Sequence, residues 1–190
     1  MSALRKLFGF FGAGRLETPA RGLYLSLVAQ ARQPAFYLRC GVPDTVDGRF
    51  DMILLHAFLV LRRLKRDHPR TADLAQALFD LMFADMDRNL REMGVGDLAV
   101  GRRVKAMAAA FYGRIAAYEA GLDTNDATLA EALKRNLYRK ASPDAATIDA
   151  VADYLRREAL ALDGQPLAGM MAGAVTFGPP PTAPVAGGDR

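Results

Sequence analysis

The chain has 190 residues, 51% of them hydrophobic, which excludes a disordered protein and is enough to bury the core of one ordinary domain. Its 25 basic and 21 acidic side chains are mixed along the sequence and leave a net charge of only +4, so nothing predicts specific DNA binding. The single cysteine excludes an intramolecular disulfide and a zinc site built from several thiolates, and it fits a reducing compartment.

Residues 1–18 form a basic and aromatic segment in which Arg5 and Lys6 precede three phenylalanines. Glycines interrupt its short apolar patch and no small-residue cleavage site follows, so we do not expect a secretion signal. Its Phe and Leu side chains can lie on an anionic membrane surface; the alternatives are a strap packed on the domain and a frayed end. The lack of a long Arg- and Ser-rich leader favours a bacterial, cytoplasmic protein, with peripheral contact at the inner face of the cytoplasmic membrane as an option.

The remaining sequence predicts an all-α fold. We expect one compact domain of about six helices over residues 19–162 and a flexible Gly-, Ala- and Pro-rich tail over residues 163–190. Residues 167–177 of the tail are nevertheless apolar enough to dock on the domain. The predicted helix starts are Pro19 with Thr18 as its N-cap, Asp47 or Gly48, Thr71, Asp97, Asp126, and Pro143 with Ser142 as its N-cap.

The second predicted helix is apolar on nearly all sides, so we expect it to be the buried centre of the fold. It ends in a basic run that complements the C-terminal end of a helix. As an alternative, the run suits contact with anionic lipid or with ribosomal RNA near a nascent membrane protein. No aromatic platform accompanies the run, which argues against single-strand recognition. Its residues are Arg62, Arg63, Lys65, Arg66 and Arg70.

The stretch from Leu78 to Arg103 predicts a hairpin of two helices. Its first helix places one apolar stripe, rich in Met and Phe, opposite a face of alternating charges that can pair across turns. Gly94 closes that helix, and Asp97 opens the next. The second helix carries small side chains on one side, which let another backbone approach closely.

Few residues suggest a reaction centre. His56 lies in the apolar second helix, where a buried, hydrogen-bonded histidine is the simplest interpretation, because a lone histidine cannot make a metal site. Cys40 could be a nucleophile with His56 as its general base, but no third group that would orient the histidine is apparent. The sequence therefore favours Cys40 as a small buried side chain. Asp85 and Asp87 point about 200° apart on a helix and cannot share one ion; Asp80 and Asp87 share a face better. We therefore expect no catalytic residue, no metal and no cofactor.

Three stretches between residues 40 and 122 match the pattern of a known family. They are CGVPDTVDGRFDMILLHAFLVLRRL, LFDLMFADMDRNLREMGVGDLAVGRR and VKAMAAAFYGR. Together they resemble the ubiquinol–cytochrome c chaperone family, whose members are all-helical assembly factors for cytochrome b of the respiratory ubiquinol–cytochrome c reductase (complex III). The resemblance implies an assembly chaperone, not an enzyme, that binds newly made cytochrome b or another complex III subunit.

The mixed-charge face of the hairpin and the 8 methionines are features that suit a protein that binds an apolar helix of a partner. Two alternatives stay open. One is a lipid- or isoprenoid-handling enzyme whose aspartate-rich helix lines an apolar cavity; the other is a membrane-surface scaffold that uses residues 1–18 and the basic run. The candidate partner contacts are Asp85, Asp87, Arg91, Glu92, Asp97, Arg102, Arg103 and Lys105.

Overall fold

The computed structural model describes residues 13–124 and 126–182, and within those ranges the chain forms helices and loops with no β-strand. The elements are α2 (Ala13–Ala31), α3 (Pro34–Leu38), α4 (Val46–Lys65), α5 (Ala72–Glu92), α6 (Asp97–Asp123), α7 (Asp126–Leu133), a π-helical turn η1 (Lys134–Tyr138), α8 (Ala145–Asp163) and α9 (Leu167–Met171). The all-α class is confirmed. The six predicted helices correspond to α2, α4, α5, α6, α7 and α8.

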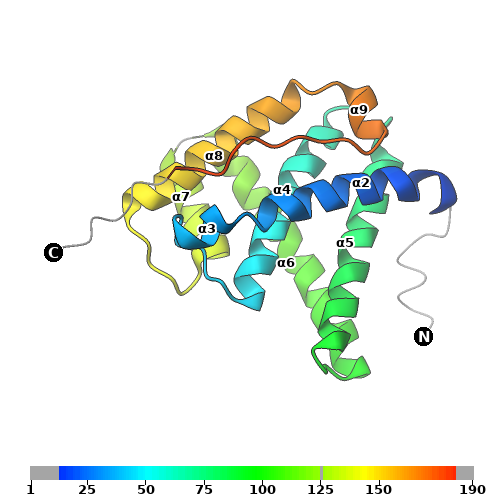
Figure 1. Cartoon of the computed structure of the whole chain (residues 1–190), viewed down its shortest axis with the longest axis horizontal. Coiled ribbons are helices and arrows are strands. Elements are labelled where there is room, and N and C mark those ends of the chain that lie inside the picture. Colours follow the sequence, from blue (N-terminus) through cyan, green and yellow to red (C-terminus); the bar gives the residue numbers. More distant parts are fainter. Residues whose placement is uncertain (1–12, 125, 183–190) are drawn as a thin grey trace.

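Helix α4 is the buried centre of the fold, as its apolar composition predicted. Every residue from Asp51 to Val60 is buried, and α2, α5, α8 and η1 all pack against this helix. Thr45 caps its start by accepting the Gly48 N–H at 3.1 Å. Figure 1 shows α5 and α6 projecting from this centre as a long hairpin. Within the described ranges, no helix combines the length and hydrophobicity that a bilayer crossing requires.

Helix α2 begins earlier than the Thr18–Pro19 pair predicted. It starts at Ala13, so Pro19 lies inside the helix, where it removes one backbone donor without ending the helix. Leu23 and Leu27 pack this helix onto the core, and both are fully buried, as expected. Residues 1–12, most of the segment with a predicted membrane contact, lie outside the described residues.

Helix α8 begins later than predicted. Its first residue is Ala145, because the Asp144 carboxylate accepts the Thr147 N–H at 2.7 Å and serves as the N-cap. Pro143 instead lies against Gly41, in the loop that precedes α4. Serine and aspartate are both good N-caps, so the local sequence alone did not decide between the two starts.

The segment after α8, where we expected a flexible tail from residue 163, is docked on the domain over its described part. Residues 164–182 pack on the domain: α9 turns the chain back, and the C-terminal strap, residues 172–182, runs along α8 (Figure 1). Phe177 lies edge-on to the His56 ring, with centroids 5.3 Å apart. The apolar part of the expected tail therefore docks on the core, and residues 183–190 lie outside the described part of the chain.

Polar side chains from α2 and α8 hold the strap. The Gly178 N–H donates to Glu158 at 2.8 Å, and the Gly178 carbonyl accepts from Gln30 at 2.8 Å. Gln165 donates to the Thr176 carbonyl and accepts its N–H. A segment without secondary structure can stay docked in this way, because side chains satisfy its backbone groups.

Candidate functional site

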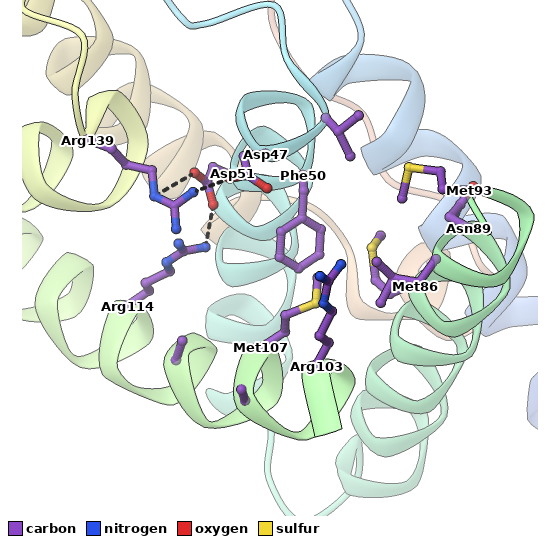
Figure 2. Close-up of a pocket in the computed structure, with 14 residues that line it drawn as sticks. Asp47, Phe50, Asp51, Met86, Asn89, Met93, Arg103, Met107, Arg114 and Arg139 are labelled. Carbon is purple, nitrogen blue, oxygen red and sulfur yellow. Dashed lines mark hydrogen bonds and ion pairs between the residues drawn. The ribbon is translucent and has the colours of Figure 1, made fainter. Parts of the chain in front are cut away.

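An open groove of about 530 Å³ lies between α4, α5 and α6. We call it the methionine groove, and Figure 2 shows its lining side chains. Its apolar walls consist of Val46, Phe50, Met86, Leu90, Met93, Ala106, Met107 and Ala110. Its polar lining consists of Asp47, Asp51, Asn89, Arg103, Arg114 and Arg139.

Helical periodicity explains how each wall is built. Helix α5 with its C-cap residue contributes positions 86, 89, 90 and 93, and α6 contributes 103, 106, 107, 110 and 114, so each set lies along one helical face. The floor comes from the first turns of α4, through Phe50 and Asp51. Part of the methionine stripe of α5 thus lines an open surface instead of the core: Met86 is buried, but Met93 is 50% exposed.

A buried charge cluster forms one end of the groove. The Asp51 side chain is 1% exposed, and its Oδ1 pairs with Arg114 at 2.6 Å. Arg139 pairs with the exposed Asp47 at 3.0 Å and places its Nε 3.6 Å from Asp51 Oδ2. Burial raises the Asp51 pKa to about 6, an effect that the two nearby arginines oppose.

This cluster was not predicted from the sequence. Its only signal was Asp51 itself, an acid in an otherwise apolar helix, which predicts a buried and paired carboxylate. The two arginines that pair with it come from α6 and from the turn after η1. Only the tertiary fold brings them together.

The candidate partner contacts on the α5–α6 hairpin divide into three groups. Asp85 is half-buried and accepts the Tyr24 hydroxyl at 2.8 Å, so it ties α5 to α2. Arg91 bridges Asp87, at 2.6 Å, and Asp97 across the hairpin turn. The remaining candidates are exposed, and Arg103 alone among all eight lines the groove. They are Glu92, Arg102, Arg103 and Lys105.

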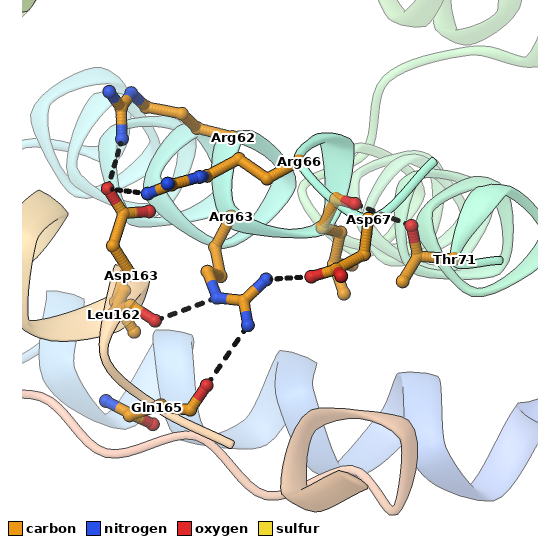
Figure 3. Close-up of polar contacts among 9 residues, drawn as sticks. Arg62, Arg63, Arg66, Asp67, Thr71, Leu162, Asp163 and Gln165 are labelled. Carbon is orange, nitrogen blue, oxygen red and sulfur yellow. Dashed lines mark hydrogen bonds and ion pairs between the residues drawn. The ribbon is translucent and has the colours of Figure 1, made fainter. Parts of the chain in front are cut away.

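The basic run at the end of α4 is largely engaged within the domain (Figure 3). Arg63 is buried and donates to the Leu162 carbonyl at the end of α8, at 3.0 Å, and to the Gln165 carbonyl just beyond it, at 3.1 Å. Arg62 and Arg66 both pair with Asp163, at 3.2 and 2.5 Å. The two remaining basic residues, Lys65 and Arg70, are exposed. Contact with lipid or RNA stays a prediction, and these two side chains are the ones still available for it.

His56 is a buried core histidine, as expected. Its Nδ1 lies 2.8 Å from the Met52 carbonyl and must carry the proton, so its Nε2 accepts the Tyr154 hydroxyl at 2.8 Å. Gln30 in turn donates to the same hydroxyl at 2.9 Å. Burial lowers the His56 pKa to about 4. Cys40 is likewise buried, which confirms the interpretation as a small core side chain.

The aspartates of α5 do not line the groove. Asp80 accepts a hydrogen bond from Gln76 at 2.7 Å, and Asp87 pairs with Arg91. Within the described ranges, no group of three or more His, Cys, Asp or Glu side chains is placed to share a metal ion. This groove is therefore not the aspartate-lined cavity that the alternative of a lipid- or isoprenoid-handling enzyme requires.

Fold and groove together define a single-domain, all-α protein that carries a methionine-lined groove between three helices. A family model described as "Ubiquinol-cytochrome C chaperone" matches residues 38–177. The chain therefore belongs to the ubiquinol–cytochrome c chaperone family. The resemblance expected over residues 40–122 is confirmed, and it extends through α8 and into the C-terminal strap.

Individual relatives agree with this assignment. The chain is 28% identical over 149 residues to the mouse protein named ubiquinol-cytochrome c reductase complex assembly factor 1, with 78% of this chain and 50% of the mouse protein covered. The Xenopus laevis protein of that name is 26% identical, with 78% and 74% covered. The chain thus spans about half the length of the mouse relative.

A solved structure matches as well. The crystal structure of the Cbp3 homolog from Brucella abortus superposes with a TM-score of 0.78 at 38% sequence identity. The match covers 88% of this chain and 92% of that chain. Nearly the whole domain therefore has a counterpart of the same fold.

Proposed function

We propose that this protein is an assembly chaperone of ubiquinol–cytochrome c reductase that binds a subunit of that complex in the methionine groove, without enzymatic turnover. We take newly made cytochrome b as the client, meaning the bound subunit. The observation that carries the proposal is family membership over residues 38–177, a span that includes every wall of the groove.

The lining of the groove supports this proposal. Met86, Met93 and Met107 present flexible, polarizable thioethers to one open space, and such surfaces adapt to varied apolar partners. Phe50 and Leu90 extend the same apolar wall, and Arg103 lies beside Met107 (Figure 2). An apolar helix can rest in such a trough with its outer face still reachable by later assembly partners.

Two neighbouring alanines on α6 supply a matched test. Ala110 lines the groove and Ala109 does not, yet both are exposed, so an aspartate at either position leaves the core intact. In cells that lack the gene, assembled complex III and the absorbance of cytochrome b should fall. The full chain and its Ala109→Asp variant should restore both, whereas Ala110→Asp should not, because it places a charge against the apolar client.

The outcomes separate the function from the site. Normal cytochrome b absorbance without the gene would refute the assembly role. Full restoration by Ala110→Asp would refute the groove as the binding site and leave the assembly role standing. A tagged pull-down from detergent-solubilised membranes, followed by mass spectrometry, identifies the client and tests whether it is cytochrome b.

Location and secondary contacts belong to the same proposal. We place the protein in the cytoplasm, near the membrane where a cytochrome b would insert, with ribosome proximity and anionic lipid as further contacts. Lys65 and Arg70 are exposed cations of the basic run, and unlike the exposed Arg66 they are not drawn into the ion pairs with Asp163, so they support such contacts. Flotation with vesicles that contain phosphatidylserine, compared between the full chain and Lys65→Gln with Arg70→Gln, tests the lipid contact.

A further inference from the structure

The floor of the methionine groove holds a hydrogen-bond acceptor that the described chain leaves unused. The Asp51 side chain is 1% exposed, and Arg114 engages only its Oδ1. Its Oδ2 is buried and has no hydrogen-bond partner among the described residues. Buried carboxylate oxygens normally receive donors, so this oxygen marks a position where a donor is missing.

Arg139 forms a long ion pair with this oxygen but no hydrogen bond. Its Nε lies 3.6 Å from Oδ2, while its Nη1 donates to Asp47 at 3.0 Å. The Arg139 and Asp47 side chains are 46% and 79% exposed, so water competes strongly for their pair. The Arg139 guanidinium is therefore a weakly held cover over Asp51.

The groove continues from this acceptor along an apolar wall. Figure 2 places Asp51 next to Phe50, with Met107 and then Met86 and Met93 farther along. A helix that lies on the methionines can thus reach the acceptor with one long side chain. The required group is a donor, because an acidic group would leave Oδ2 unpaired and would add a carboxylate beside Asp47.

We infer that the groove takes an apolar helical segment that carries one basic side chain, which displaces Arg139 and donates to Oδ2 of Asp51. The inference rests on the proposed function, since it names the chemistry of the client that the same groove binds. The apolar wall supplies most of the affinity, and Asp51 selects the charge. Arg139 occupies the acceptor position until the client arrives.

A set of synthetic peptides tests this selection on the full-length protein. Each is a Leu- and Ala-based helix of roughly 18 residues, long enough to be helical, with serines on its outer face. The peptides differ only at one central position, which is Arg, Gln or Glu. The Arg peptide should bind about tenfold more tightly than the Gln peptide, as a charge-assisted hydrogen bond predicts, and the Glu peptide should bind most weakly.

Three variants separate the inference from simpler explanations. Asp51→Asn should abolish the preference for Arg, and because it leaves Arg114 without its partner, its fold is checked by circular dichroism. Arg139→Gln keeps the buried pair and should bind the Arg peptide more tightly than the unmodified protein does, because the competing cation is gone. Arg102→Gln removes the same charge from an exposed site outside the groove and should not raise affinity for that peptide.

The possible failures are distinct. Equal affinity for the Arg and Gln peptides, or an Arg139→Gln variant that binds no better than Arg102→Gln, would overturn the inference and leave the groove as an apolar binding site. Binding of none of the peptides would overturn both the inference and the proposed binding site.

Discussion

The buried histidine of α4 makes stability depend on pH in a predictable direction. His56 is neutral in the folded protein, because its ring is fully buried and its Nε2 accepts the Tyr154 hydroxyl. Burial lowers its pKa from 6.5 to about 4. In the unfolded chain the same ring is free to take up a proton below pH 6.5. The stabilising contribution is therefore complete above pH 6.5 and is lost as the pH falls through about 4.

The size of the effect follows from the shift. A change from 6.5 to about 4, at about 1.4 kcal/mol per pH unit, corresponds to about 3 kcal/mol of unfolding free energy. Asp51 acts in the opposite sense, because burial raises its pKa from 3.8 to about 6. Its contribution is complete below pH 3.8 and is lost as the pH rises through about 6. In the pH profile of the wild-type protein the contributions of His56 and Asp51 partly cancel. The prediction therefore concerns the difference in unfolding free energy between wild type and a variant that lacks His56.

His56→Gln removes the titrating group while retaining an acceptor for Tyr154 and a donor for the Met52 carbonyl. The matched control is His68→Gln, which removes the other histidine, at an exposed site. Unfolding free energies are measured by urea titration, with helix content followed by circular dichroism, from about pH 7.5 down to about pH 4. The unfolding free energy of wild type, relative to that of His56→Gln, should fall by about 3 kcal/mol as the pH is lowered across this range.

Two outcomes would refute this reasoning. If the stabilities of wild type and His56→Gln change in parallel with pH, His56 does not titrate differently in the folded and unfolded states. If His68→Gln produces the same convergence with wild type as His56→Gln, the effect does not come from the buried ring.

Three further predictions concern packing and the strap. Gly22→Ala should lower the unfolding free energy by about 1–3 kcal/mol, because the new Cβ would lie 2.5 Å from the Gly173 carbonyl oxygen of the strap. Its matched control is Gly113→Ala, which has open space around the new Cβ and should raise the unfolding free energy by about 0.5–1 kcal/mol through helix propensity. Arg63→Met should lower it by about 3 kcal/mol, because backbone carbonyls at the end of α8 lose their donor, and Lys65→Met should change it by less than about 0.5 kcal/mol. Glu158→Ala should speed amide hydrogen exchange in the strap, measured by mass spectrometry, and leave exchange in α5 unchanged. Equal effects within either matched pair, or an unchanged strap, would contradict the contacts described.

The sequence by itself determined the helices and their buried faces. The apolar positions of α4, the stripe of α5 and the leucines of α7 were all predictable, because a period of 3.6 residues is a local property that needs no knowledge of neighbours. Family membership was equally accessible from the sequence. His56 was identified as a core residue because a lone histidine in an apolar helix has few other roles.

Only the tertiary structure decided which faces meet and which stay open. An apolar stripe requires burial but does not name its partner, so periodicity cannot show that α4, α5 and α6 leave a groove lined by Met86 and Met107. Likewise, a charged residue pairs with whichever opposite charge the packing brings near. Arg63 and Asp51 therefore bond to residues of helices that lie far from α4 in the sequence, α8 and α6 respectively. The strap likewise bonds to Gln30 of α2 and Glu158 of α8.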